Sequence, residues 1–461
     1  MPAASEITAS PSMDVAPVAR PAAHGRGIRA IGQTIGSRIL IQGLNAITGI
    51  LTARLLLPEG RGQLAAITLW SSLLAGLTTF GLPSALIYHV RHRPKQTGDL
   101  LASALTMTLV LSCVAAGVGA LCMPHWLHQY PAWGIRAAQW FLLVTPLCAA
   151  ALIFRGALEA RGAFSLSNLA QLLNPSVTLV LLLFFLAIHR FNAITASCAY
   201  IFAALPVFLL LVWQARGFFD RFSRPTVAAS KLLLSYGLRS YGIDLLGTLA
   251  LQVDQVIVVS FLTASDLGIY VVMLSLSRML NVFQTSVVMV LFPKAAGRTG
   301  ETAIALTARA ARVSTSITGL CAIALAIVGP VLLRMFYGRE YAHSIGCLRL
   351  LLLEVTISGC VFVLAQAFMA LGRPGVVTLL QAAGLFLSLP MMLLLIPRWG
   401  IQGAAVALLT STCARFIFIY LGFRLVLKVP APSLLPRKED FFILVSALKR
   451  VTGRRLHECP R

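Results

Sequence analysis

Twelve runs of about 20 mostly apolar residues divide this 461-residue chain, and they constrain its fold more than any other feature. A helix of about 20 residues spans the hydrocarbon core of a bilayer. The sequence therefore predicts an all-α polytopic membrane protein with about twelve transmembrane helices. The expected spans are residues 31–57, 63–88, 100–123, 138–160, 166–187, 193–214, 235–262, 267–293, 313–336, 346–371, 375–397 and 401–427.

The low charge content excludes a purely soluble enzyme. Charged residues make up 11% of the chain, and the mean hydropathy is +0.85, whereas ordinary soluble domains contain about 25% charged residues. A net charge of +23 would indicate nucleic-acid binding in a soluble protein. No basic stretch here is interleaved with stacking aromatics outside the apolar runs. We therefore expect no nucleic-acid partner.

The basic residues lie mainly on one side of the predicted membrane. With a cytoplasmic N-terminus, the cytoplasmic side holds 25 Lys and Arg, counting Arg155 and Arg161 with the loop after the fourth span, and the outer side holds six. Cytoplasmic loops of membrane proteins are enriched in these residues. Both termini are therefore expected in the cytoplasm.

A basic linker at residues 215–234 separates six spans from six. We predict a disordered cytoplasmic tail at 1–27, an N-lobe at 28–214, a C-lobe at 235–427 and a basic cytoplasmic tail at 428–461. Within that tail, the short apolar run Phe441–Leu448 either lies on the membrane surface as an interfacial helix or belongs to a loosely ordered segment.

The two halves show weak internal similarity. At an offset of 210 residues, five positions match, and Glu59 and Gly62 in the turn after the first span resemble Asp266 and Gly268 after the seventh. Parallel repeats related by an axis along the membrane normal place a cavity between the halves in some transporters. The matches at offset 210 are Ala157, Ala160, Gly162, Leu169 and Gln171 with Ala367, Ala370, Gly372, Leu379 and Gln381.

Arginines outnumber acids within the spans. An ionisable side chain at membrane depth costs about 2.5–3.5 kcal/mol, so it usually faces a bundle interior or a wet cavity. Arg278 lies mid-span, where its side chain reaches the interface least easily. We predict that Arg38, Arg239 and Arg278 form a cationic substrate-binding cavity, which would suit an anionic cargo. We interpret Arg54 and Arg424 as interfacial anchors, and Arg349 as a structural partner of Glu354 or of other helices.

Two acids on the seventh span have two open interpretations. Asp244 and Asp254 lie ten residues apart and so share roughly one side of a helix. They would bind a coupling cation or proton, or they would pair with cavity arginines. Gln33, Gln42 and Asn45 make the first span similarly polar, so we expect the two spans to line one cavity.

No pattern of catalytic or metal-binding residues is present in the sequence. The nine cysteines are scattered without CxxC spacing. His125 and His128 have i,i+3 spacing, but two histidines alone make a poor metal site. We predict no catalytic residue, no metal site and no cofactor.

Three stretches resemble polysaccharide-exporting flippases of the multidrug/oligosaccharidyl-lipid/polysaccharide exporter superfamily. The resemblance covers about residues 30–427 and rests on spacing more than on single residues. The second stretch begins at Asp254-Gln-Val-Ile-Val-Val-Ser-Phe-Leu and continues to Gly268-Ile-Tyr. The others are Pro58-Glu-Gly-Arg-Gly-Gln-Leu-Ala with Gly81-Leu-Pro-Ser-Ala-Leu, and Pro397-Arg-Trp-Gly-Ile-Gln-Gly-Ala-Ala.

The resemblance implies two six-helix lobes around a V-shaped cavity. It also implies flipping of a polyprenyl-diphosphate-linked glycan across the bacterial inner membrane by alternating access, for surface polysaccharide assembly, with a polymerase and other export proteins as further partners. The related lipid II flippases often have fourteen spans, and we find twelve. Alternatives are a cation-coupled drug or metabolite antiporter of the same superfamily, a membrane glycosyltransferase or polymerase, and a non-transporting scaffold.

Overall fold

The computed structural model describes residues 24–218, 223–295, 300–430 and 432–434, and within those ranges the chain is helical without strands. The predicted N-terminal tail up to residue 23, the centre of the linker at 219–222 and the run Phe441–Leu448 lie outside the described residues. The helices are α1 (His24–Leu77), α2 (Leu82–His92), α3 (Thr97–Trp126), α4 (Ala132–Phe141), α5 (Thr145–Ala160), α6 (Phe164–Ala187), α7 (Ala193–Ala215), α8 (Val227–Phe261), α9 (Ala264–Arg278), α10 (Asn281–Ala295), α11 (Gly300–Leu332), α12 (Arg339–Ala342), α13 (Ile345–Ala370) and α14 (Pro374–Leu425).

The predicted membrane spans are confirmed as helical, although the second (63–88) is interrupted at residues 78–81 and the eighth (267–293) at residues 279–280. Among the described residues, ten helical stretches are long and apolar enough to cross a membrane. Two of them, Gly36–Leu77 and Pro374–Leu425, are about twice the length of one crossing and are broken by non-helical residues. Each therefore supplies two of the twelve predicted spans, and the chain is a multi-pass membrane protein.

Local chemistry explains both breaks. Leu57 has a φ of 61° and precedes Pro58, and the residue before a proline is disfavoured in the helical region. Pro58 then starts the second arm of α1, where its missing N–H costs nothing. Gly400 breaks α14 with a φ of 57° and a ψ of −137°, a conformation that glycine adopts without a steric penalty.

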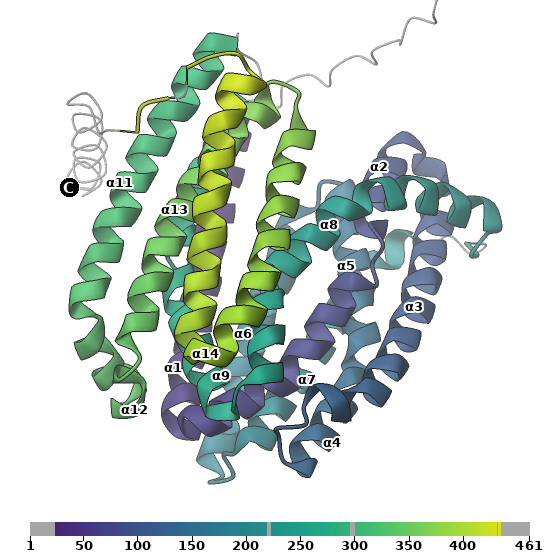
Figure 1. Cartoon of the computed structure of the whole chain (residues 1–461). Coiled ribbons are helices and arrows are strands. Elements are labelled where there is room, and N and C mark those ends of the chain that lie inside the picture. The colour runs from purple at the N-terminus through teal and green to yellow at the C-terminus, as the bar shows by residue number, and fades with distance from the viewer. Residues whose placement is uncertain (1–23, 219–222, 296–299, 431, 435–461) are drawn as a thin grey trace, which may run out of the picture.

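The helices form two groups that diverge toward one face of the molecule. Figure 1 shows that α1 begins and α14 ends at this face, which we call the termini face, whereas α4 and α12 lie at the opposite face. The first-half helices α1–α7 and the second-half helices α9–α14 approach each other at the opposite face (Figure 1). Helix α8 connects the two groups.

The buried core follows the same division. One hydrophobic cluster joins both halves and includes Trp70, Leu142, Tyr270 and Leu351. Two further clusters each belong mainly to one half: the first combines α2, α3, α5 and α7 with the start of α8, and the second combines α10, α11, α13 and α14. The halves thus share a core near the opposite face and keep separate cores near the termini face.

A reciprocal glycine contact joins the halves at the opposite face. A Cβ atom on Gly62 would collide with the carbonyl oxygen of Ala264, and one on Gly268 would collide with that of Pro58. Pro58 begins the second arm of α1, and Ala264 begins α9. Each glycine therefore lies four residues into one helix, directly against the start of the other, as small residues do where membrane helices approach closely.

Hydrogen bonds close the same seam. The Tyr341 hydroxyl donates to the Ala53 carbonyl at 3.1 Å, and Arg54 Nη1 donates to the Met335 carbonyl at 2.6 Å. Burial raises the pKa of the Tyr341 hydroxyl, so it stays protonated and keeps donating. Arg54 therefore bridges the halves, in addition to lying near the end of its span as the sequence predicted.

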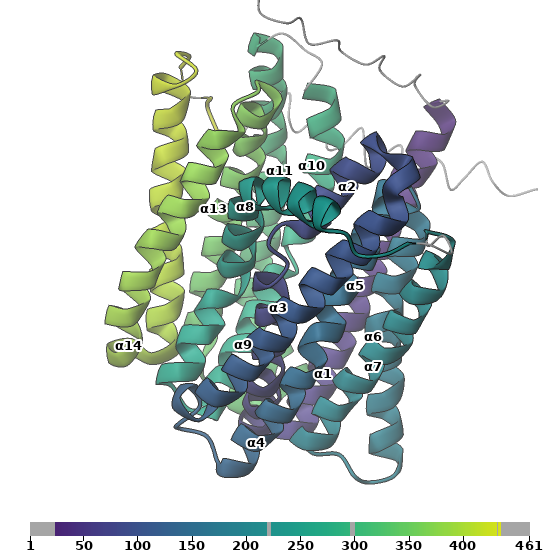
Figure 2. The same ribbon diagram turned by 90° about the vertical axis from the view of Figure 1, so that its right-hand side faces the viewer.

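The start of α8 packs on the first half. Figure 2 shows it beside α2 at the termini face. Ala229 and Leu233 lie in the first-half core, and the rings of Tyr88 and Tyr236 stack with centroids 4.5 Å apart. The domain boundary at residues 215–234 remains a prediction.

The predicted repeat has a matching backbone pattern. Gly162 and Gly372, 210 residues apart, follow α5 and α13 with φ values of 76° and 72°. After each glycine, the next residue donates its backbone N–H five residues back, Ala163 to Leu158 and Arg373 to Phe368. Both helices thus end in the same glycine cap.

Candidate functional site

Arg278 and Asp254 form an ion pair in the interior of the bundle. Arg278 ends α9, and its Nη2 lies 3.2 Å from Oδ2 of Asp254 on α8. The same oxygen accepts from the Tyr270 hydroxyl at 2.9 Å, and Arg278 Nη1 donates to the Leu251 carbonyl at 3.0 Å. Asp254 is 1% exposed and Arg278 is 28% exposed. The acid is therefore enclosed, whereas part of the guanidinium remains accessible.

Arg278 lines a cavity between the two halves, which we call the central cavity. Its volume is about 340 Å³. Arg61, from the second arm of α1, also lines it, and the buried Nε of Arg61 has no hydrogen-bond partner among the described residues. The sequence analysis did not single out Arg61 as a site residue. The polar lining also includes Gln42, Asn45, Thr48, Tyr200, Ser275 and Tyr337.

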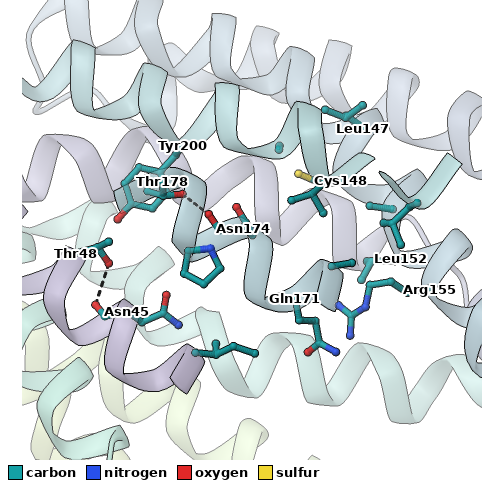
Figure 3. Close-up of a pocket in the computed structure, with 17 residues that line it drawn as sticks. Asn45, Thr48, Leu147, Cys148, Leu152, Arg155, Gln171, Asn174, Thr178 and Tyr200 are labelled. Atoms are coloured by element: carbon teal, nitrogen blue, oxygen red, sulfur yellow. Dashed lines mark hydrogen bonds between the residues drawn. The ribbon is translucent and has the colours of Figure 1, made fainter. Parts of the chain in front are cut away.

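A second cavity lies within the first half, between α1, α5, α6 and α7, and we call it the first-half cavity. Its volume is about 360 Å³, and it shares Asn45, Thr48 and Tyr200 with the central cavity. Figure 3 shows Arg155 and Gln171 facing each other at one end, and Asn45, Asn174 and Tyr200 toward the other. The two cavities are therefore neighbours that share a polar wall.

Arg155 is a site residue that the sequence analysis missed. It was counted with the cytoplasmic loop after the fourth span, but it lies on α5, five residues before the helix ends. It lines both the first-half cavity and a side cavity of about 390 Å³ between α1, α2, α5 and α8. A cationic side chain thus connects a third cavity to the other two.

Asp244 lines the side cavity and is separate from the Arg278 pair. Ser84 Oγ donates to its Oδ2 at 3.4 Å, and no ion pair of Asp244 is found in the described ranges. The two acids predicted to act together thus occupy different environments: Asp254 is buried against an arginine, and Asp244 faces a cavity.

Arg38 and Arg239 lie apart from these cavities. Both side chains are exposed, and neither lines a cavity described above. Of the three predicted cationic residues, Arg278 is the one that lines the central cavity. The binding roles of Arg38 and Arg239 remain predictions.

A second buried ion pair lies inside the second half. Arg415 Nη2 on α14 is 3.8 Å from Glu354 Oε1 on α13, and the Thr412 hydroxyl donates to the same carboxylate oxygen at 2.8 Å. The sequence left open whether Glu354 pairs with Arg349 of its own helix or with another helix. The structure pairs Glu354 with Arg415 of α14, whereas Arg349 is exposed.

The cavities can hold a polar, anionic molecule. Guanidinium groups bind phosphate and carboxylate oxygens in a planar fork and stay charged when buried. No group of three or more His, Cys, Asp or Glu side chains suited to a metal ion occurs in the part of the chain that the structure describes.

Comparison with known proteins identifies the fold and the family. The model of a family described as "Polysaccharide biosynthesis protein" matches residues 28–296. No curated protein matches the chain. Among solved structures, a lipid II flippase MurJ in an inward closed conformation is 12% identical, with a TM-score of 0.75 and coverage of 93% of each chain.

Two multidrug transporter structures in different conformations match this chain to different degrees. An inward-facing multidrug resistance MATE family transporter of the MOP superfamily gives a TM-score of 0.70 at 16% identity, covering 84% of this chain and 94% of that one. An outward-facing one gives 0.58 at 15% identity, covering 86% and 95%. The fold is therefore that of the MOP superfamily, as predicted.

Proposed function

Because this chain belongs to the polysaccharide biosynthesis protein family, we propose that it flips a polyprenyl-diphosphate-linked oligosaccharide across the bacterial inner membrane, for assembly of O-antigen, capsule or exopolysaccharide. The observation that carries the proposal is the central cavity, where Arg61 and Arg278 face one space between the two halves. Two arginines there offer donors to a diphosphate, while the lipid tail stays in the bilayer between the diverging helix groups.

The proposed orientation puts the termini face in the cytoplasm. The loops and tails on that side carry most of the Lys and Arg of the chain, and such residues are retained on the cytoplasmic side. With that orientation, the diverging helices open inward and the seam at Gly62 and Gly268 closes the outer side. Transport then alternates between this arrangement and one in which the seam has parted. A polysaccharide polymerase would receive the flipped glycan.

Translocation by the purified protein tests the proposal. In proteoliposomes, the wild type should move a fluorescent short-chain polyprenyl-diphosphate-linked oligosaccharide. Arg278→Ala should slow this by about tenfold, because a hydrogen bond to a charged group contributes about 1.5–3 kcal/mol. Since that variant leaves Asp254 buried without its arginine, the double variant with Asp254→Asn should be equally slow.

The matched control is Arg349→Ala, which removes an exposed arginine from α13. It should flip the lipid at the wild-type rate. A wild-type protein that moves no lipid-linked glycan would reject the function, and a fully active Arg278→Ala would reject the site.

The cation-coupled antiporter remains the second candidate because Asp244 faces a cavity and has no ion-pair partner among the residues that the structure describes. If a cation drives the cycle, Asp244→Asn should abolish the effect of a sodium or proton gradient on flipping. Retention of gradient-driven flipping by that variant would exclude Asp244 from coupling.

A further inference from the structure

The first-half cavity contains one cation, Arg155, that makes no direct contact with a carboxylate. Arg155 forms no hydrogen bond or ion pair within the described ranges, and its buried Nε lacks a partner. Glu159, one helical turn further along α5, attracts the guanidinium from a distance, and it accepts a hydrogen bond from Ser167 at 2.8 Å. A partly buried charge without a partner is costly unless water or a ligand takes its place.

Neutral polar groups face the same space. The side-chain amides of Asn45 and Asn174 are exposed to it inside long helices, and neither these amides nor the Tyr200 hydroxyl bonds to another described residue. Gln171 faces Arg155 across the cavity (Figure 3). Amides both donate and accept, and an aromatic ring adds a flat apolar face. This combination matches a sugar, which presents hydroxyls and C–H surfaces together.

The internal repeat supplies a comparison within the same molecule. A cavity of about 300 Å³ in the second half is lined by residues at the same offset of 210. Arg155 corresponds there to Ala365. The full set is Cys148, Ala151, Leu152, Arg155, Ala170 and Gln171, against Ser358, Val361, Phe362, Ala365, Leu380 and Gln381.

An arginine also lines the second-half cavity, but it already forms an ion pair with a carboxylate. Arg415 reaches it from α14, pairs with Glu354 and donates to the Thr412 hydroxyl at 2.6 Å. The two related cavities therefore differ in direct pairing: the second-half arginine contacts a carboxylate, and the first-half arginine does not.

We propose that the first-half cavity binds an acidic sugar residue of the glycan, with the sugar's anionic group paired to Arg155 and its hydroxyls bonded to Asn45 and Asn174. The proposal rests on the proposed function, because the cavity adjoins the central cavity that would hold the diphosphate. It narrows the substrate class to glycans that carry a carboxylate, such as a uronic acid.

Two synthetic substrates test this subsite. Both carry the same short polyprenyl chain and diphosphate, and their disaccharides end in glucuronate or in glucose. The wild type should bind and flip the glucuronate lipid about tenfold better, which corresponds to about 1.4 kcal/mol. Arg155→Gln should lower the affinity and flipping rate for the glucuronate lipid about tenfold, and those for the glucose lipid much less, so that the preference for glucuronate disappears.

Two further variants separate charge from structure. Arg155→Lys keeps the charge and should retain part of the preference for glucuronate. Arg136→Gln removes one positive charge from the exposed surface of α4 and should retain the full preference for the glucuronate lipid. Equal loss of both lipids in Arg155→Gln would overturn the proposal, because Arg155 would then hold the diphosphate or the fold.

Equilibrium binding in detergent keeps the subsite testable apart from transport. Failure of the wild type to flip either lipid would reject the proposed function, and binding would still decide the subsite. Equal wild-type affinity for the two lipids would overturn the subsite even if both lipids were flipped.

Discussion

The arginines inside this bundle differ in whether they form an ion pair with a carboxylate. Arg278 pairs directly with Asp254 and Arg415 with Glu354, whereas Arg155 contacts no carboxylate in the described ranges and is attracted only from a distance by Glu159. Breaking a buried pair is costly because one charge is left behind. We therefore expect Arg415 mainly to stabilise the fold and Arg155 mainly to bind a ligand. Arg278 should contribute to both.

Replacing Glu354 by alanine should destabilise the protein by about 3–5 kcal/mol, because Arg415 would remain in the interior without its carboxylate. The measurement is the thermal unfolding midpoint in detergent. The double variant Glu354→Leu with Arg415→Leu should recover most of the loss, since an apolar pair of similar volume replaces the ions. A single variant as stable as the wild type would mean that water already solvates Arg415.

The sequence predicts single site residues only in part. Arg278 could be found because it lies mid-span, far from both interfaces. Arg155 and Arg61 could not, because position along a span gives depth in the membrane but not which face of the helix points inward. The repeat holds a usable signal: at the offset of 210, Arg155 stands where the other half has Ala365.

The positions of the helices are the feature of this structure that the sequence predicts best. The apolar runs locate them, and Pro58 and Gly400 lie at the two sharp turns for reasons of backbone chemistry. The break between α9 and α10 at residues 279–280 was not predicted. Met279 and Leu280 have no turn-forming character, so tertiary packing rather than local sequence ends α9 there.

The glycine contact between α1 and α9 yields a prediction for whole helices. Gly62→Val should prevent the helix starts from meeting, because its side chain would collide with the Ala264 carbonyl. The seam should then part, and flipping should fall strongly. Gly117→Val is the control, since a Cβ at Gly117 meets no other atom within 4 Å.

Chemical crosslinking across the seam reports the outcome. In a background without the native cysteines, cysteines at Arg54 and Met335 should be joined by a short bifunctional maleimide, because the hydrogen bond from the Arg54 guanidinium to the Met335 carbonyl places the two backbones within about one arginine side chain of each other. The crosslinked fraction should drop when Gly62→Val is added and stay constant with Gly117→Val. An unchanged yield in both variants would show that the seam tolerates the extra volume.

At the scale of the whole molecule, the sequence does not predict how the two halves are placed relative to each other. Apolar runs indicate that a helix is buried in lipid or protein, but they do not indicate which helix it packs against. The shared core near one face and separate cores near the other define the conformation. This arrangement agrees with the TM-scores, which are higher for the inward-facing transporter than for the outward-facing one.

Cysteine labelling tests that conformation together with its orientation. If the diverging helices open to the cytoplasm as proposed, Asn174→Cys in the wall of the first-half cavity should react with a membrane-impermeant maleimide in inverted vesicles and not in spheroplasts. Arg136→Cys on α4 should show the reverse pattern. Labelling of Asn174→Cys only in spheroplasts would invert the proposed topology.

The reciprocal contact of Gly62 and Gly268 gives the seam the geometry of an isologous dimer interface, with the same patch presented by each partner. We therefore propose that the chain behaves as two tethered subunits. Expressed as separate polypeptides, residues 1–218 and 223–461 should reassociate without a covalent link, guided by this self-complementary patch and by the packing of the α8 start on the first half.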